Sequence, residues 1–594
     1  MPDGSLGLGY TNVTTVMDVQ PDAVKGKRMV QSEKTGCLQS IFVQQPNRHF
    51  ARSLIVTEKI FRLVHHDRSG LYVTPLFNIH KDAPLFVQFV VGLSSPNERH
   101  LGLDTSVQWT IDKASGKKVS GTIEVLEKDE ATGSTTSTVY DLDMSEPPYV
   151  RPDIRGRGTV AWHAFDCTTK EPVLIKDTWH TDSQEVECEY LRDARGIPGI
   201  VEMIAFQDHI VETEDYRPPG FRNKEFRNRA NLRVVMKKYG RSVWFFKSRL
   251  QLLLALRDAL IGHHTLFERG IIHRDVSVQN ILLGRPTAPD GYRGVLIDLD
   301  MACRTEACKS SVPADPYIGT RVYQSVSVIH TLTVKPAPPQ DYMDDLESFF
   351  YVLCHLFYTF RKPGEVQEKV PGLLQHWDMD NLLVLALSKQ GFILRFTQTQ
   401  MMSPYWGEAS ETLLEEVQAV IRDITYRKSE IRASRDLYAE AKLKAYGVMA
   451  RNHTDYYEKV KSAFDKAISG LEREGLNADE LGQDPVGSCA PPHATLSIAA
   501  LEASHPPPAS APLPIANSPS ALEVATSSAG PTVKRRPSED SEVVTSVKRV
   551  RKDLVPESAP PIPPSMTGNQ RPKSSGGCAA GTPPPLINMD LKRD

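Results

Sequence analysis

The chain contains 594 residues, with 70 Lys and Arg against 73 Asp and Glu, 43 Pro and only 8 Cys. This length provides enough sequence for more than one structural unit. No direct nucleic-acid partner is expected, because non-specific affinity for phosphate backbones requires accumulated positive charge. No apolar run is long enough to span a membrane and the first residues show no signal pattern, so we expect an intracellular protein without a membrane segment. The cysteines show no CxxC pair or metal-ligand spacing, which disfavours a disulfide scaffold and a zinc module.

The first predicted elements are strands between residues 50 and 79. Two apolar runs, residues 60–64 and 71–76, flank a polar turn at residues 67–70. Later segments are predicted in chain order as a strand at residues 173–176, a helix around residues 185–192 and a long helix at about residues 248–267. Apolar residues then recur at helical spacing within residues 346–360 and 457–471, and both stripes are interpreted as core helices.

The composition changes sharply near residue 480. The last 114 residues hold 20 of the 43 prolines and contain no Phe, Trp or Tyr. Such a segment cannot bury enough apolar surface to offset the entropy lost on ordering, so residues 476–594 are expected to form a disordered Pro- and Ser-rich tail. Its basic clusters at residues 534–536 and 548–552 predict a bipartite nuclear import signal, with chance clustering as the alternative. An import receptor is therefore a candidate partner, and the nucleus, the cytoplasm or both are the expected locations.

The most informative segment is His273-Arg274-Asp275 followed by Asn280, which matches the pattern H-R-D-x-x-x-x-N. In this pattern the carboxylate accepts or orients the proton of an attacking hydroxyl, and the amide holds a metal that bridges nucleotide phosphates. Eighteen residues beyond Asn280, the apolar run 294–297 ends in Asp298, and a carboxylate there suits Mg²⁺. Each motif alone is common in surface loops, but the two in this order and spacing indicate a phosphotransferase site.

On these motifs the sequence resembles the eukaryotic protein kinase superfamily, and more closely the fungal-type protein kinase family. The closer resemblance rests on residues 233–242 (RVVMKKYGRS), 344–350 (DDLESFF) and the turn at 66–70 (HDRSG), and it covers about residues 40–475. It implies an α+β, bilobal protein-kinase-like fold. The implied parts are a partly flexible segment at 1–39, a family-specific extension at 40–150, a β-rich N-terminal lobe at 151–240, a helical C-terminal lobe at 241–475 and the disordered tail at 476–594.

The resemblance also implies how the chain binds ATP. Lys176 would contact the α- and β-phosphates, and Glu187 would hold its ammonium, with Glu189 as the competing partner. Gly156 and Gly158 resemble the loop that covers the phosphates, although this motif is weak because Ala161 stands where a third glycine is usual. The implied gatekeeper and the implied linker residue at the nucleotide are Met236 and Lys238. An ordinary strand-end lysine and a core methionine are the alternatives for Lys176 and Met236.

For the transfer step, the resemblance implies Asp275 as the catalytic carboxylate and Asn280 and Asp298 as the Mg²⁺ ligands. Thr320, after Gly319, would support Asp275 from the end of an activation segment at residues 298–325, and Asp345 would anchor the catalytic loop. Arg274 could pair with a phosphorylated residue in that segment, where Thr305, Ser310 and Ser311 are available.

Two positions depart from the family pattern. Ser277 stands where most Ser/Thr kinases place a lysine that touches the transferring phosphate, and Asp300 replaces the glycine of the usual D-F-G. If Asp300 faced the site, two carboxylates could grip magnesium. Otherwise Asp300 forms a hydrogen bond within its own loop, which is the interpretation we favour.

A separate basic stretch, residues 217–249, contains eleven Lys and Arg and one acidic residue. We interpret it as a solvent-exposed face rather than a docking site for an acidic partner.

The sequence therefore predicts a Mg²⁺-dependent protein kinase that transfers the γ-phosphate of ATP to Ser or Thr hydroxyls of a protein substrate. A small-molecule phosphotransferase of the aminoglycoside- or choline-kinase type is the second hypothesis, supported by Ser277 and Asp300. A pseudokinase scaffold is the third, and only the departures from the pattern support it.

Overall fold

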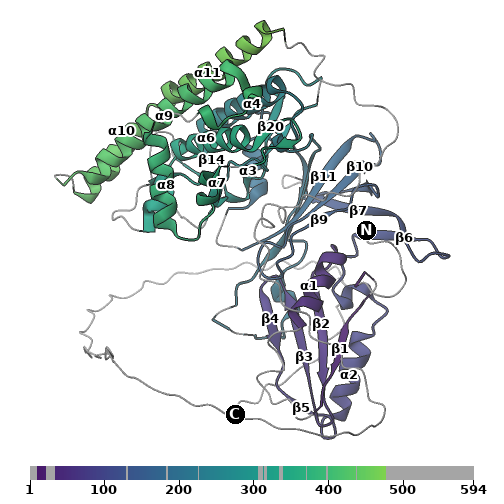
Figure 1. The fold of residues 1–594 in the computed structure, drawn as a ribbon. Helices are drawn as coiled ribbons and strands as arrows, with labels where there is room; N and C mark the ends of the chain where they lie inside the picture. The colour runs from purple at the N-terminus through teal and green to yellow at the C-terminus, as the bar shows by residue number, and fades with distance from the viewer. Residues whose placement is uncertain are drawn as a thin grey trace, which may run out of the picture. The chain divides into compact units, whose positions relative to one another are not determined.

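The computed structural model describes residues 10–475, except for residues 12, 22–33, 129–131, 182–184, 222, 225, 286, 306–311, 314–317, 333–338, 370, 396–398 and 436–437. The described residues combine sheets and helices in an α+β fold (Figure 1). All of them belong to the first of two units into which the chain divides. The expected tail at residues 476–594, with its basic clusters, lies outside the described residues.

A first sheet is built from the N-terminal part of the chain in the order β1-β2-β3-β4, with β5 beside β3. Its strands are β1 (Val16–Val19), β2 (Phe50–Val56), β3 (Ile60–Asp67), β4 (Gly70–Val73) and β5 (Phe77–Asn78), and the accompanying helices are α1 (Lys34–Gln44) and α2 (Ala83–Leu93). The predicted polar turn joins β3 to β4, where a carboxylate oxygen of Asp67 accepts hydrogen bonds from the backbone N–H of Ser69 and Gly70. Such an Asx arrangement fixes a tight turn.

An eight-stranded sheet follows, in the order β12-β13-β11-β10-β8-β7-β6, with β9 beside β10. Its strands are β6 (Val107–Ile111), β7 (Lys118–Lys128), β8 (Thr135–Leu142), β9 (Tyr149–Val150), β10 (Val160–Asp166), β11 (Pro172–His180), β12 (Met203–Gln207) and β13 (Ala230–Lys237). Helix α3 (Glu187–Asp193) stands between β11 and β12 in the chain. The sheet crosses residue 150, the predicted end of the extension, because β8 and β9 both pair with β10.

The remainder of the described chain is mainly helical. Its helices are α4 (Arg249–Glu268), α5 (Val326–Ile329), α6 (Tyr342–Thr359), α7 (Gly372–His376), α8 (Leu382–Leu394), α9 (Gly407–Ala433), α10 (Ala439–Ala450) and α11 (His453–Arg473). Short strand pairs accompany them: β14 (Ile271–Ile272) with β17 (Cys303–Arg304), β15 (Ile281–Leu283) with β16 (Gly294–Leu296), β18 (Val312–Pro313) with β19 (Pro339–Gln340), and β20 (Phe360–Lys362) with β21 (Glu365–Val366). The two predicted apolar stripes fall on α6 and α11, and both contribute to one large hydrophobic core together with α4. None of the helices in the described ranges combines the length and the apolar composition that a bilayer crossing requires.

Buried ion pairs join the N-terminal residues to the larger sheet. Arg233 of β13 is 1% exposed and donates hydrogen bonds to Asp104 at 2.7 Å and to Asp177 of β11 at 2.7 and 3.0 Å. Arg217 likewise pairs with Asp67 of the first sheet. Removing one partner from such a buried pair would leave an uncompensated charge. The Arg233 pairs therefore hold β13, β11 and the segment before β6 together, and the Arg217–Asp67 pair holds the first sheet to the segment before β13.

Candidate active site

The candidate catalytic loop lies between β14 and β15 and is held by one buried carboxylate. Asp345, in the first turn of α6, accepts hydrogen bonds from the backbone N–H of His273 at 2.9 Å and of Arg274 at 3.1 Å, and from Nε2 of His263 at 2.8 Å. The hydroxyl of Tyr457 donates to Nδ1 of that same histidine at 2.7 Å. Burial alone would raise the pKa of Asp345, but the hydrogen bonds outweigh it and lower the pKa. Three helices, α4, α6 and α11, therefore fix this loop.

Asp275 points toward Thr320 and Asn280. Its Oδ1 accepts hydrogen bonds from the backbone N–H of Thr320 at 2.8 Å and from the Thr320 hydroxyl at 2.7 Å. Its Oδ2 lies 3.2 Å from Nδ2 of Asn280, which also donates to the Asp275 carbonyl at 2.9 Å. Burial, and then repulsion from Asp298, raise the pKa of Asp275 to about 6, while the Thr320 bonds act in the opposite direction. Such a carboxylate is deprotonated at neutral pH and basic enough to accept a proton.

Backbone conformations that side chains rarely adopt cluster around this loop. Arg274 has φ +66° and Asp298 has φ +71°, although neither is a glycine. Gly319 has φ +84°, and a Cβ there would collide with the carbonyl of Arg274. Strained non-glycine residues persist only where the surrounding contacts over-determine them, and they concentrate at functional sites.

Lys176 of β11 lies among three carboxylates. Its Nζ donates to the two oxygens of Glu187 at 2.8 and 2.9 Å and to Asp298 at 2.7 Å, and it lies 3.1 Å from Asp300. Glu189, the competing partner, instead pairs with Arg192. Burial disfavours the charged ammonium, but the three carboxylates, Asp298 foremost, raise the pKa of Lys176 well above its ordinary value. The lysine is therefore held as a cation by the helix and by the segment after β16.

The three carboxylates around the Lys176 ammonium could also hold a metal ion. Oxygens of Glu187, Asp298 and Asp300 lie within 4.8 Å of one another. Burial, and then Asp300, raise the pKa of Glu187, while Lys176 acts in the opposite direction. Hard carboxylate oxygens are the ligands that Mg²⁺ prefers, so the residues present fit this ion. The N–H of Ile297, which precedes Asp298 in the chain, donates to the Asn280 carbonyl at 2.8 Å.

The preferred reading of Asp300, a hydrogen bond confined to its own loop, is wrong. The residue lies in the short 3₁₀ turn at Leu299–Met301, and its Oδ2 is 3.1 Å from Nζ of Lys176 and 3.1 Å from Nη1 of Arg157. The physical reason is charge, because a buried ammonium and a guanidinium attract this carboxylate more strongly than a local turn can. Asp300 therefore belongs to the site.

The loop at residues 151–159, which contains Gly156 and Gly158, is held by the turn between β3 and β4. The N–H of Gly156 donates to the carbonyl of Arg68 at 3.0 Å, and Nη1 of Arg68 donates to the carbonyls of Asp153 at 3.0 Å and Ile154 at 3.3 Å. Gly158 has φ +50°, and any Cβ there would collide with the Arg68 guanidinium. The glycine is thus required by this close approach as well as by its backbone conformation.

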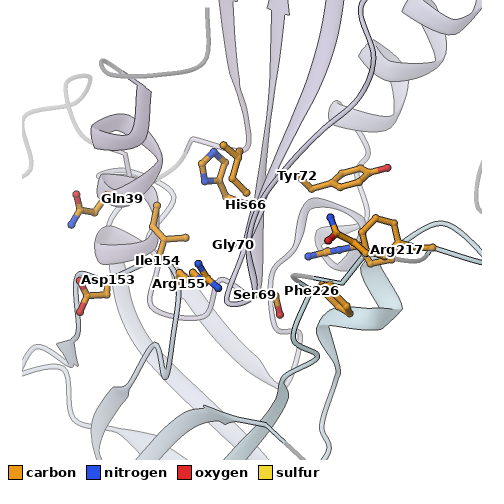
Figure 2. Close-up of a pocket in the computed structure, with 13 residues that line it drawn as sticks. Gln39, His66, Ser69, Gly70, Tyr72, Asp153, Ile154, Arg155, Arg217 and Phe226 are labelled. Carbon is orange, nitrogen blue, oxygen red and sulfur yellow. The ribbon is translucent and has the colours of Figure 1, made fainter. Parts of the chain in front are cut away.

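A pocket of about 630 Å³ lies along the same loop, as Figure 2 shows. It is lined by Asp153, Ile154 and Arg155 of the loop, by His66 and Ser69 to Tyr72 around the β3–β4 turn, by Gln39 of α1, and by residues after Tyr216. It shares no lining residue with the cluster around Lys176. The pocket is therefore separate from the cluster around Lys176, although Arg155 of the glycine loop lines it.

The remaining residues that the sequence predicted for the site have the following surroundings. Met236 is buried in β13 within the main core, as a core methionine is, and its gatekeeper role, which is compatible with this place, stays a prediction. Nζ of Lys238 donates to Glu146 at 3.1 Å. Nε of Arg274 donates to the carbonyl of Met301 at 2.7 Å. Thr305 donates its N–H to the Gly270 carbonyl at 2.7 Å, while Ser310 and Ser311 lie outside the described residues.

A model of the family described as fungal protein kinase matches residues 8–218 and 212–357, which is more than half of the chain. The chain belongs to the fungal protein kinase family. The resemblance inferred from the motifs is thereby confirmed, and the activity of this fungal protein kinase is that of a phosphotransferase. No curated protein matches the chain.

Four residues at or near the site of this fungal protein kinase were not singled out from the sequence. His263 and Tyr457 support Asp345, Arg157 pairs with Asp300, and Arg68 holds the glycine loop. Arg157 lies inside the glycine motif and Arg68 inside the turn at residues 66–70. Their charge within a recognised motif is the feature from which the sequence could have indicated them. His263 and Tyr457 carried no such signal, because their neighbours come from distant helices.

Proposed function

We propose that the protein is an ATP-dependent protein kinase that transfers the γ-phosphate to Ser or Thr hydroxyls of protein substrates and requires Mg²⁺. The observation that carries the proposal is the convergence of two groups. One is Asp275 with Thr320 and Asn280, and the other is Lys176 with Glu187 and Asp298. Family membership supports the same reaction class. The β-rich part up to Lys237 and the helical part after it would act as the two lobes of a bilobal kinase.

In the proposed mechanism, the attacking hydroxyl approaches Asp275 on the side of Thr320. Asp275 orients the hydroxyl and accepts its proton as the oxygen bonds to the γ-phosphorus and ADP leaves. Lys176, oriented by Glu187, binds the α- and β-phosphates. The loop with Gly156 and Gly158 would cover those phosphates with its backbone N–H groups.

Asp298 and Asn280 would hold Mg²⁺, and Asp300, which lies within 4.8 Å of Asp298, would be a third oxygen donor. The ion would supply positive charge against the phosphate oxygens. Met236 and Lys238 would border the adenine. Arg274 would respond to phosphorylation of the segment after Asp298. Catalysis then consists chiefly of positioning and charge stabilisation.

The decisive test is incorporation of labelled γ-phosphate into a Ser/Thr peptide library, with and without EDTA. The parent chain should phosphorylate peptides in Mg²⁺ only, and Asp275→Asn should lower the rate by about a thousandfold, because general-base assistance is lost. Asp290→Asn, an exposed aspartate, serves as the matched control and should behave as the parent does. Equal rates in parent and Asp275→Asn would refute the assignment.

A small-molecule phosphotransferase is the second candidate, and the position of Asp300 favours it. The sequence Asp298-Leu299-Asp300 resembles the ending found in small-molecule phosphotransferases, and both carboxylates reach Lys176. The contact of Thr320 with Asp275 supports the protein-kinase proposal instead. Offering hydroxylated metabolites beside the peptide library separates the two, since phosphate would appear on only one class. A pseudokinase scaffold would bind ATP and label neither.

A further inference from the structure

Two departures from the kinase pattern both make the candidate site more negative. Ser277 removes a cation from the catalytic loop, and Asp300 adds an anion beside Lys176. Ser277 is 1% exposed, and its hydroxyl accepts a hydrogen bond from the N–H of Asn280 at 3.3 Å. The side chain is therefore part of the loop's own packing, and no positive charge comes from this position.

Arg157 provides a cation from a different segment. Its Nη1 lies 3.1 Å from Oδ2 of Asp300, and its charge also acts on Asp275 and Asp298. The side chain of Arg157 is 31% exposed, whereas that of Asp300 is 10% exposed. The guanidinium thus lies at the mouth of the carboxylate cluster, between the glycine loop and the catalytic carboxylates.

The backbone around Arg157 is fixed on both sides. The N–H of Trp179 in β11 donates to the Arg157 carbonyl at 2.8 Å, and Gly156 and Gly158 on either side both meet Arg68. Arg155, two residues earlier, lines the separate pocket instead (Figure 2). The loop therefore carries three arginines in different surroundings: Arg151 pairs with Asp153, Arg155 lines the pocket, and Arg157 contacts Asp300 of the candidate active site.

We propose that Arg157 is a catalytic residue that binds the γ-phosphate, replacing the cation missing at Ser277, and that Asp300 is the positioning residue that holds it there. This inference rests on the proposed function. A guanidinium presents several N–H donors in a planar fork and suits phosphate oxygens. As the hydroxyl oxygen bonds to phosphorus, the bond to ADP breaks and the proton passes to Asp275, Arg157 would stabilise the charge on the transferring group.

The test compares ATP with ADP, which differ by the γ-phosphate. Binding of each nucleotide in Mg²⁺ is measured by calorimetry for the parent, Arg157→Ala and Arg157→Lys. Arg157→Ala should raise the Kd for ATP about tenfold and change the Kd for ADP less than about twofold, because one charge-assisted contact to phosphate is lost. Arg157→Lys should recover part of the ATP affinity. In the peptide assay, kcat should fall more in Arg157→Ala than in Arg157→Lys.

Arg155→Ala is the matched control, because it removes the same charge from the same loop. It should bind both nucleotides as the parent does. Equal weakening of ATP and ADP in Arg157→Ala, or no weakening, would overturn the role of Arg157 while leaving the proposed function intact. A parent chain that binds neither nucleotide would overturn both. Thermal unfolding of each variant separates these outcomes from misfolding, and Arg157→Lys keeps the test decisive if the alanine variant does not fold.

Discussion

The catalytic loop and the glycine loop carry the two halves of the candidate site, and they are held in different ways. The catalytic loop is anchored by hydrogen bonds to Asp345, whose carboxylate is 2% exposed and is surrounded by helices of the main core. The glycine loop is held by Arg68, from the turn of a separate N-terminal sheet. One half of the site therefore depends on core packing, and the other depends on a contact between sheets that a local change could loosen.

The largest effect is expected from breaking the first anchor. Asp345→Ala leaves buried N–H donors of His273, Arg274 and His263 without an acceptor, which should lower the free energy of unfolding by about 3 kcal/mol. Urea denaturation measures this loss. Asp345→Asn, which keeps an acceptor oxygen, should lose less, and Asp378→Ala, a carboxylate outside this network, should be close to the parent. Equal stability of Asp345→Ala and the parent would refute the anchoring role.

The pH dependence of activity should report on the catalytic half. Burial and Asp298 raise the pKa of Asp275 to about 6, so the base form is present above that pH and is lost as the pH falls through it. We expect kcat/KM to fall about tenfold per pH unit below this value. The measurement is a rate profile at fixed Mg²⁺. A profile that stays flat down to pH 4.5, near the ordinary range of a carboxyl, would contradict the assignment of Asp275 as the base.

A smaller effect is expected from loosening the second anchor. Arg68→Gln removes the charged donor that holds the carbonyls of Asp153 and Ile154, so the KM for ATP should rise about threefold while kcat changes less. Hydrogen exchange should also speed up at residues 151–159. Arg151→Gln, a partly exposed arginine on the same loop, provides the control. If the two variants gave the same KM, the first sheet would have no part in positioning the glycine loop.

Much of the candidate site was predictable because short motifs encode short-range geometry. The H-R-D segment identified Asp275 and Asn280, whose contact spans five residues of one loop. Lys176 and Glu187 were predictable as a pair, since the strand and the following helix are close in the chain. The direction of Asp300 was predicted wrongly, because it depends on Lys176 and on Arg157, which precedes it by 143 residues.

By itself, the sequence determined the family, the order of the main elements and the identity of the residues expected to handle phosphate. Periodicity and motif spacing report local structure. The main elements and the motif residues are defined by such short-range structure, so they could be predicted from the sequence. Only the tertiary structure decided that β6–β9 join β10–β13 in one sheet, that Arg68 supports the glycine loop and that Arg157 meets Asp300. These contacts join segments far apart in the chain, and buried charges find their partners only when packing brings those segments together.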